Sequence, residues 1–147
     1  MDVTSTESSP ALMPTRDARP SQVFVVEDSD VVRALWRTVV AKIAGLSLRG
    51  EFSRASTAIA AIRREAPDVV LLDINLSDGN GMEVLRVATA ECPMTKVIVV
   101  SNCADPTHRR YFAKAGAHAF YDKSHELAAV RRMLASLAGV RSPASLS

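Results

Sequence analysis

Carboxylates, a hydroxyl and an ammonium group stand where short apolar runs of the sequence end. Glu27 and Asp28 follow one run, Asp73 and Ser101 each end another, and Lys123 lies two residues beyond the last. Two carboxylates about 4 Å apart repel by roughly 4 kcal/mol at an effective dielectric near 20, so three together need a cation. Oxygen ligands suit Mg²⁺ better than zinc, for which no Cys/His set is spaced here. These residues therefore predict a cation-binding site formed by carboxylates.

A parallel β-sheet would bring these distant residues together, because all of its strands end at one edge. After residue 20, short β-branched runs alternate with segments of helical period, which is typical of βαβ units. The consecutive Val, Ile and Leu residues predict that the second, third and fourth strands are covered on both faces. The fold class is therefore α/β, with three layers. The five predicted strands are residues 22–26, 46–51, 68–73, 96–101 and 117–121.

The segments between the predicted strands have the apolar spacing of amphipathic helices. Val32, Leu35, Val39 and Ile43 form one face of the first helix, and Trp36 lies at its edge. Two interpretations of Trp36 are open: an anchor for a docking partner, or packing at the edge of the core. The fourth helix is predicted from about residue 105 to 115, closed by Gly116, and the fifth begins with Ser124 as its N-cap. Arg109 and Arg110 on the fourth helix are expected either to line an output face or to be solvated.

Composition limits the classes of protein that the chain can represent. Its 147 residues are 48% apolar, enough for one buried core, and a net charge of +2 does not indicate a nucleic-acid or membrane binder. No apolar run approaches the roughly 20 residues that span a bilayer, and no signal peptide is recognisable, so a cytoplasmic protein is expected. Residues 1–20 are predicted as a disordered arm, residues 21–139 as one domain and residues 140–147 as a short flexible tail.

Four segments of the sequence together resemble the receiver domains of bacterial two-component response regulators, including the chemotaxis regulators. The resemblance covers about residues 22 to 138, and the four segments occur in order with β/α spacing between them. It implies a doubly wound, flavodoxin-like sheet with strand order 2-1-3-4-5. The segments are Val25-Val26-Glu27-Asp28, Val69-Val70-Leu71-Leu72-Asp73-Ile74-Asn75, Val100-Ser101 and Phe120-Tyr121-Asp122-Lys123.

The resemblance implies a role for each acidic residue. Asp73 matches the phosphoryl acceptor, and Asp28 matches the residue that ligates Mg²⁺ directly. Glu27 matches the acid that acts mainly through metal-bound water, and the backbone carbonyl of Asn75 matches a further ligand. A Mg²⁺-dependent phosphorylation of Asp73 is therefore expected.

The resemblance also implies a switch. Ser101 matches the hydroxyl that moves toward the phosphoryl group, and Lys123 matches the ammonium that pairs first with Asp73 and then with a phosphoryl oxygen. Phe120 matches the aromatic side chain that changes rotamer on activation. Phosphorylation is expected to change the protein surface through these residues.

Two positions depart from the family pattern. Ser124 stands where many members have a proline in a cis peptide bond, and trans is the default isomer for a non-proline bond. Asn102 stands where members usually have a small residue, so we expect narrower access to Asp73. Both positions adjoin predicted site residues.

The function that the resemblance implies is that of a stand-alone response regulator. A histidine kinase or a histidine phosphotransfer protein would donate the phosphoryl group, and an unknown protein target would receive the signal. Only 24 residues follow Lys123, so no DNA-binding domain is expected. No enzyme activity is expected beyond the protein's own phosphorylation and dephosphorylation.

Three rival functions stay open. A phosphate relay or sink would use the same residues, whereas a pseudo-receiver would bind partners without phosphorylation, which the intact acid, Ser and Lys set disfavours. A hydrolase of the haloacid dehalogenase type also uses a strand-end Asp and Mg²⁺. It would need a second acid where this sequence has Asn75.

Overall fold

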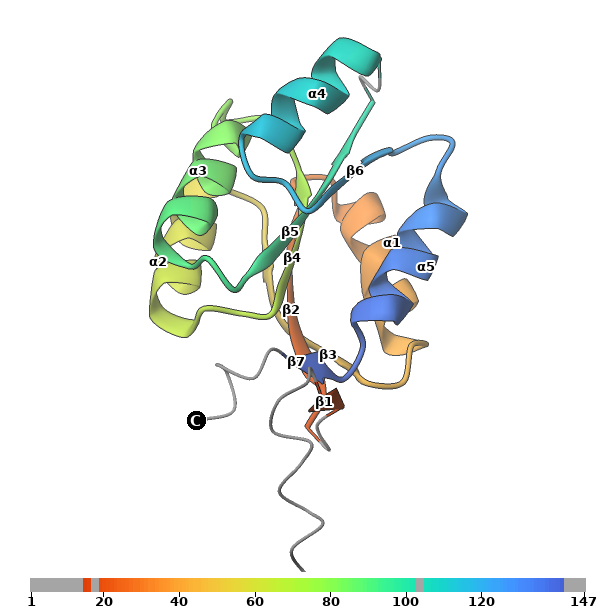
Figure 1. The fold of residues 1–147 in the computed structure, drawn as a ribbon. Helices are drawn as coiled ribbons and strands as arrows, with labels where there is room; N and C mark the ends of the chain where they lie inside the picture. The colour runs from red at the N-terminus through yellow and green to blue at the C-terminus, as the bar shows by residue number, and fades with distance from the viewer. Residues whose placement is uncertain (1–14, 17–18, 103–104, 142–147) are drawn as a thin grey trace, which may run out of the picture.

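A five-stranded parallel sheet forms the middle layer of the protein (Figure 1). The computed structural model describes residues 15–16, 19–102 and 105–141. The strand order is β3-β2-β4-β5-β6, so the predicted 2-1-3-4-5 order of the doubly wound fold is confirmed. The strands are β2 Ser21–Val26, β3 Leu46–Phe52, β4 Val69–Asp73, β5 Lys96–Ser101 and β6 Ala119–Asp122.

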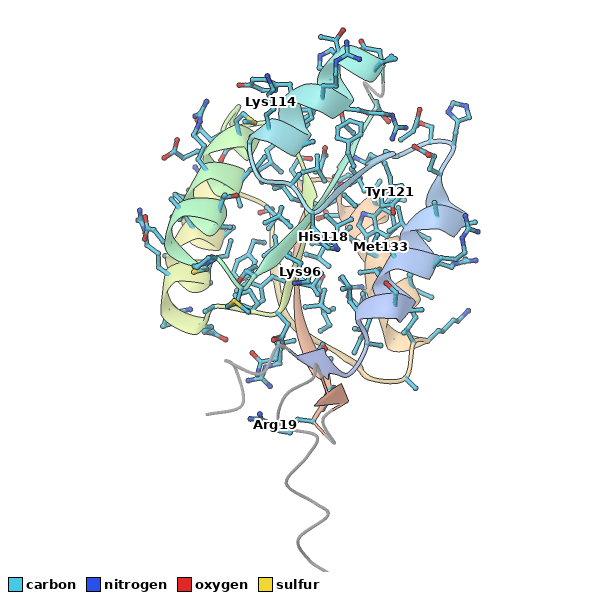
Figure 2. The ribbon with its side chains drawn as sticks, in the orientation of Figure 1. Arg19, Lys96, Lys114, His118, Tyr121 and Met133 are labelled. Carbon is cyan, nitrogen blue, oxygen red and sulfur yellow. The ribbon has the colours of Figure 1, made fainter. Side chains whose placement is uncertain are left out.

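Five helices cover the two faces of this sheet (Figure 1). One core lies between the sheet and α1 and α5, and the other lies between the sheet and α2, α3 and α4. Figure 2 shows Tyr121 and Met133 in the first of these layers, where both are partly buried. The helices are α1 Asp30–Ala41, α2 Ala55–Glu65, α3 Gly81–Glu91, α4 Pro106–Lys114 and α5 Leu127–Leu137.

The three inner strands send successive side chains into the two cores in turn, because side chains alternate across a strand. In β4, Val70 and Leu72 enter the core beside α2 and α3, while Val69 and Leu71 enter the other. The expected burial of the third and fourth strands is confirmed. It is wrong for the second strand, β3, which is half-exposed because it lies at the edge of the sheet. The first strand, β2, is buried on both faces instead.

The indole of Trp36 is part of the core rather than of the surface. Trp36 is 2% exposed and packs with residues of α1, α5 and the sheet, so its interpretation as a docking anchor is wrong. Leu35, which the spacing placed on the apolar face, is 41% exposed. The buried stripe of α1 is thus turned by about one residue from the predicted one, since neighbouring residues lie about 100° apart on a helix.

The start of α5 differs from the prediction. Ser124 is not the N-cap; Glu126 precedes the helix, which begins at Leu127. The carboxylate of Asp122 accepts hydrogen bonds from the backbone N–H groups of Ser124 and His125, which holds these residues in a turn. The helix can therefore start only after that turn. The predicted closure of α4 at Gly116 agrees with its positive φ of 105°.

A second, two-stranded sheet joins the two ends of the described chain. β1 (Thr15–Arg16) pairs antiparallel with β7 (Val140–Arg141), so four residues of the expected arm and tail have defined backbone structure. The rest of the predicted arm, residues 1–14 and 17–18, and residues 142–147 of the tail lie outside the described residues. In the described part of the chain, no helix is long and apolar enough to cross a membrane.

The backbone of Gly81 lies in close contact with the backbone of Ile74, and this contact fixes the path of the chain between β4 and α3. A Cβ atom at this position would lie 2.1 Å from the backbone oxygen of Ile74, which follows the strand-end Asp73. Real Cβ atoms do not approach an oxygen so closely, and a backbone oxygen cannot turn aside as a side chain can. The start of α3 therefore lies directly against the segment that follows Asp73.

We predict that Gly81→Ala lowers the free energy of unfolding by about 3 kcal/mol, because the added methyl group must push two backbone segments apart. Gly79→Ala is the matched control. Nothing lies within 4 Å of a Cβ there, and only its φ of +79° opposes the change, so a loss of about 1 kcal/mol is expected. Urea unfolding followed by circular dichroism measures both. Equal losses would contradict the close packing at Gly81.

Candidate functional site

Three carboxylates meet at the carboxyl edge of the sheet. Glu27 and Asp28 follow β2, Asp73 ends β4, and these two strands are hydrogen-bonded neighbours. One carboxylate oxygen from each of the three residues lies within 4.8 Å of the other two. Glu27 and Asp73 are almost fully buried, at 1% and 3% exposure, and Asp28 is partly exposed. The cluster predicted from the sequence is thus present.

Lys123 supplies the positive charge that this cluster requires. Its Nζ lies 2.9 Å from an oxygen of Asp73 and 2.9 Å from Oε1 of Glu27. Its backbone N–H donates to the carbonyl of Ser101, and this bond holds Lys123, which follows β6, beside the end of β5. One ammonium group therefore faces two buried carboxylates.

The pKa values of the cluster reflect this balance of charge and burial. Burial raises the pKa of Glu27, and the hydrogen bond from the N–H of Ser29 and the nearby ammonium group of Lys123 offset this effect only in part. Burial lowers the pKa of Lys123, but its bonds to Asp73 and Glu27 outweigh that effect, and its pKa is raised overall. At Asp28, partial burial favours a higher pKa, yet the hydrogen bonds from Ser77 prevail and lower it. Asp28 is thus held as a carboxylate at the open side of the cluster.

The donor set fits a hard divalent cation. Oε1 of Glu27 is buried, and although Lys123 faces it, it accepts no aligned hydrogen bond from the described residues. A buried carboxylate oxygen in that state is costly unless a cation satisfies it. Glu27, Asp28 and Asp73 offer only oxygen atoms, with the partly exposed Asp28 leaving access for water, as Mg²⁺ prefers. These three residues would hold the ion.

Asn75 links the acid cluster to the end of β5. Its backbone N–H donates to Oδ1 of Asp73 at 3.0 Å, and its side-chain amide donates to the hydroxyl of Ser101 at 3.0 Å. The family resemblance implied a role only for the backbone carbonyl of Asn75, and no sequence pattern predicted the bond from its side chain to Ser101. Ser101 is buried, at 1% exposure, and lies near the acids as predicted.

Phe120 is enclosed in the core rather than free at the surface. It is 8% exposed, and its ring stacks on Phe112 at a centroid distance of 5.2 Å. Arg109 lies over the Phe120 ring, donates to the Phe120 carbonyl and pairs with Glu126. The interpretation of Arg109 as simply solvated is wrong, because it joins α4 to the segment between β6 and α5, whereas a role on an output face stays a prediction. No spacing rule could have paired Arg109 with Glu126.

The two positions that depart from the family pattern are hydrogen-bonded to each other. The hydroxyl of Ser124 donates to the side-chain oxygen of Asn102 at 3.2 Å, joining the segments that follow β5 and β6. None of the described peptide bonds is cis, so the bond between Lys123 and Ser124 is trans. Narrower access to Asp73 at Asn102 stays a prediction.

Comparisons with known proteins agree on one family. Residues 23–135 match the family model described as the response regulator receiver domain. Response regulator GacA of Pseudomonas viridiflava is 31% identical over 107 residues, which are 73% of this chain and 50% of that protein. A protein-glutamate methylesterase/protein-glutamine glutaminase of Anaeromyxobacter dehalogenans is 38% identical over 88 residues, 60% of this chain and 24% of that protein. The chain thus spans half or less of the length of these curated relatives.

Solved structures agree with the same fold. The response regulator domain of CheB from Thermotoga maritima is 25% identical, with a TM-score of 0.67 over 80% of this chain and 90% of that one. A LuxR-family two-component response regulator from Aurantimonas sp. SI85-9A1 is 24% identical, with a TM-score of 0.71 over 83% and 88%. The latter likeness concerns the fold alone.

We predict that Asp28→Asn weakens Mg²⁺ binding at least tenfold, because it removes a charged oxygen ligand. Asp30→Asn is the matched control, since Asp30 lies two residues away, has a side chain 90% exposed and pairs with Arg33 instead. Mg²⁺ titrations followed by Trp36 fluorescence or amide chemical shifts measure both. Equal affinities of wild type and Asp28→Asn would show that the cluster does not bind the ion.

Proposed function

This chain belongs to the response regulator receiver domain family, and on that premise we propose that Asp73 accepts a phosphoryl group from a histidine-bearing partner. Receiver domains of response regulators accept a phosphoryl group on an aspartate in two-component signalling. The position of Asp73 carries the proposal. It is buried between two acids, with one oxygen bonded to Lys123 and the other to the N–H of Asn75.

Each residue has a part in the proposed transfer. A carboxylate oxygen of Asp73 attacks the phosphorus atom of a phosphohistidine; the P–N bond breaks, and its electron pair stays on the imidazole nitrogen. Lys123, already 2.9 Å from Asp73, pairs with the negative oxygens that arrive. Bound Mg²⁺ would neutralise charge on the phosphoryl oxygens. Glu27 and Asp28 hold the negative charge that attracts the ion.

In this proposal, the partner that donates the phosphoryl group docks on α1. Val31 is 80% exposed and Leu35 is 41% exposed, and they lie one turn apart at the start of the helix that follows Asp28. Exposed apolar side chains at this spacing suit contact with a partner helix. Since Trp36 is buried, these two residues replace it as the proposed anchors for a histidine kinase or histidine phosphotransfer protein. The proposed place of action is the cytoplasm.

A phosphate relay or sink is the second candidate, and the state of Phe120 favours it. Phe120 is already buried, stacked on Phe112 and covered by Arg109. A side chain that is held inward before phosphorylation has less far to move afterwards, so less surface change is available to a target. Because the chain spans half or less of its curated relatives, both candidates concern the receiver unit alone.

Asp73→Asn is predicted to abolish phosphorylation, while Asp30→Asn retains it, because only Asp73 has the bonds to Lys123 and Asn75. The product is expected to be an acyl phosphate that is stable in acid and hydrolysed in base. Mass spectrometry after incubation with acetyl phosphate and Mg²⁺ locates the group. Phosphate on another residue of Asp73→Asn would show that the acceptor has been misplaced.

Ser101→Ala is predicted to reduce the amide-shift changes that beryllofluoride causes in α4 and β6, without preventing beryllofluoride binding. The hydroxyl joins Asn75 to the end of β5, and β6 pairs with that strand. Thr38→Ala on α1 is a control hydroxyl deletion remote from the cluster, since it bonds only within its helix. If wild type binds the mimic and its changes stay confined to the metal-site loops, the relay or sink is supported and the switch is contradicted.

A further inference from the structure

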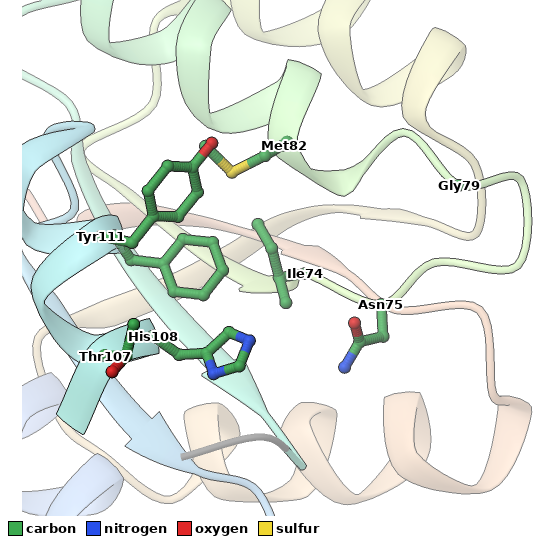
Figure 3. Close-up of a pocket in the computed structure, with 8 residues that line it drawn as sticks. Ile74, Asn75, Gly79, Met82, Thr107, His108 and Tyr111 are labelled. Atoms are coloured by element: carbon green, nitrogen blue, oxygen red, sulfur yellow. The ribbon is translucent and has the colours of Figure 1, made fainter. Parts of the chain in front are cut away.

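A cavity of about 500 Å³ lies between α4 and the start of α3 (Figure 3). Ile74, Met82, Tyr111 and Phe112 form its apolar wall; Asn75, which is bonded to Asp73, and His108 also line it. This size is in the range of about 300–1,000 Å³ that holds ligands or anchoring side chains. Figure 3 shows the rings of Tyr111 and His108, both from α4, facing the segment that follows β4.

Weak anchoring of α4 leaves this cavity open. Phe112 is the one buried residue of the helix, and Tyr111 beside it is 51% exposed although it is large and aromatic. At the far end, a Cβ on Gly116 would meet the side chain of Thr89, so the turn after α4 closes against α3. We call this cavity, together with the exposed side chains of α3 and α4 beside it, the α3–α4 groove.

The rim of the α3–α4 groove is positively charged. Lys114 lies on the last turn of α4, at its end near α3 in Figure 2, and shares a helix face with Tyr111. Among the described residues, neither Lys114 nor the exposed Arg110 has an ion-pair partner. On α3, Arg86 lies one turn beyond Met82 and has only a 3.5 Å contact with Glu83. An exposed aromatic beside unpaired cations is complementary to an acidic, partly apolar partner.

The α3–α4 groove shares residues with the phosphoryl site. Asn75 lines it and bonds to both Asp73 and Ser101, and Phe112 lines it while stacking on Phe120. An occupant would therefore touch groups that respond to the state of Asp73. This position favours a signalling protein over a metabolite as the occupant.

We propose that the α3–α4 groove binds an acidic segment of a partner protein, with an aromatic or aliphatic side chain inserted beside Tyr111 and carboxylates at Lys114 and Arg86. A second copy of this chain fits less well, because an isologous contact would bring the cations of α4 against those of the other copy. The inference does not require that Asp73 be phosphorylated.

A short fluorescein-labelled peptide with Phe-Leu at its centre and aspartates and glutamates on both sides tests this proposal by fluorescence anisotropy. Saturable binding that weakens with added salt is expected. Tyr111→Ala and Lys114→Glu should each lower the affinity about tenfold, because one removes the apolar contact and the other places like charges together. Lys42→Glu, the same charge change at the exposed residue that follows α1, should leave the affinity unchanged. The titration is made without Mg²⁺ or a phosphoryl donor, which separates this test from that of phosphorylation.

Several binding results would overturn the proposal. The first is that the peptide shows no saturable binding, and the second is that a peptide with glutamine and asparagine in place of its acids binds equally well. The third is that Lys42→Glu and Lys114→Glu lower the affinity by the same factor. The last is that the protein dimerises with rising concentration and the peptide does not reduce this dimerisation. Thermal unfolding of Tyr111→Ala and Lys114→Glu confirms that both remain folded. Amide shifts from the peptide should map to α3, α4 and Ile74 to Gly79; shifts confined to α1 would contradict the site.

Discussion

The contact of Lys123 with Glu27 and Asp73 is the interaction on which the site depends. Two buried carboxylates beside a third acid repel one another strongly in the low dielectric of the protein, and one ammonium group 2.9 Å from both offsets that repulsion. The balance is incomplete, since Oε1 of Glu27 lacks an aligned hydrogen bond and burial raises the pKa of Glu27. The cluster is therefore stable enough to fold and still able to take up further positive charge. Cation binding and phosphoryl transfer to Asp73 would both use this cluster of acids beside one ammonium group.

The parallel sheet makes this arrangement possible and also carries its effects outward. β2, β4, β5 and β6 end at one edge, so residues nearly a hundred positions apart meet there. From that edge, Asn75 connects Asp73 to Ser101, and Phe112 and Phe120 connect the sheet to α4. Arg109 then joins α4 to Glu126 before α5. With Phe112 as its one buried residue, α4 is held to the core by fewer side chains than the other helices.

Residues at strand ends could be placed from the sequence, whereas the contacts of individual side chains could not. Glu27, Asp28, Asp73, Ser101 and Lys123 were found because each closes or follows an apolar run, and the topology brings such positions together. The burial of Trp36 was left open, since a residue at the edge of an apolar stripe is buried or exposed according to a small rotation of the helix. Ser124 was misplaced as an N-cap because Asp122 accepts hydrogen bonds from the N–H groups of Ser124 and His125 and holds both residues in a turn. The partners Asn102–Ser124 and Arg109–Glu126 lie on different segments and follow no local pattern.

Thermal unfolding of Lys123→Met with and without Mg²⁺ tests the charge balance most directly. Without Mg²⁺ the variant should be less stable than wild type by about 3 kcal/mol, because two buried carboxylates lose their counter-charge. Mg²⁺ should stabilise the variant more than wild type, since the ion then replaces the missing charge, whereas the surface control Lys42→Met should behave as wild type. A Lys123→Met protein as stable as wild type, with no greater response to Mg²⁺, would contradict the account.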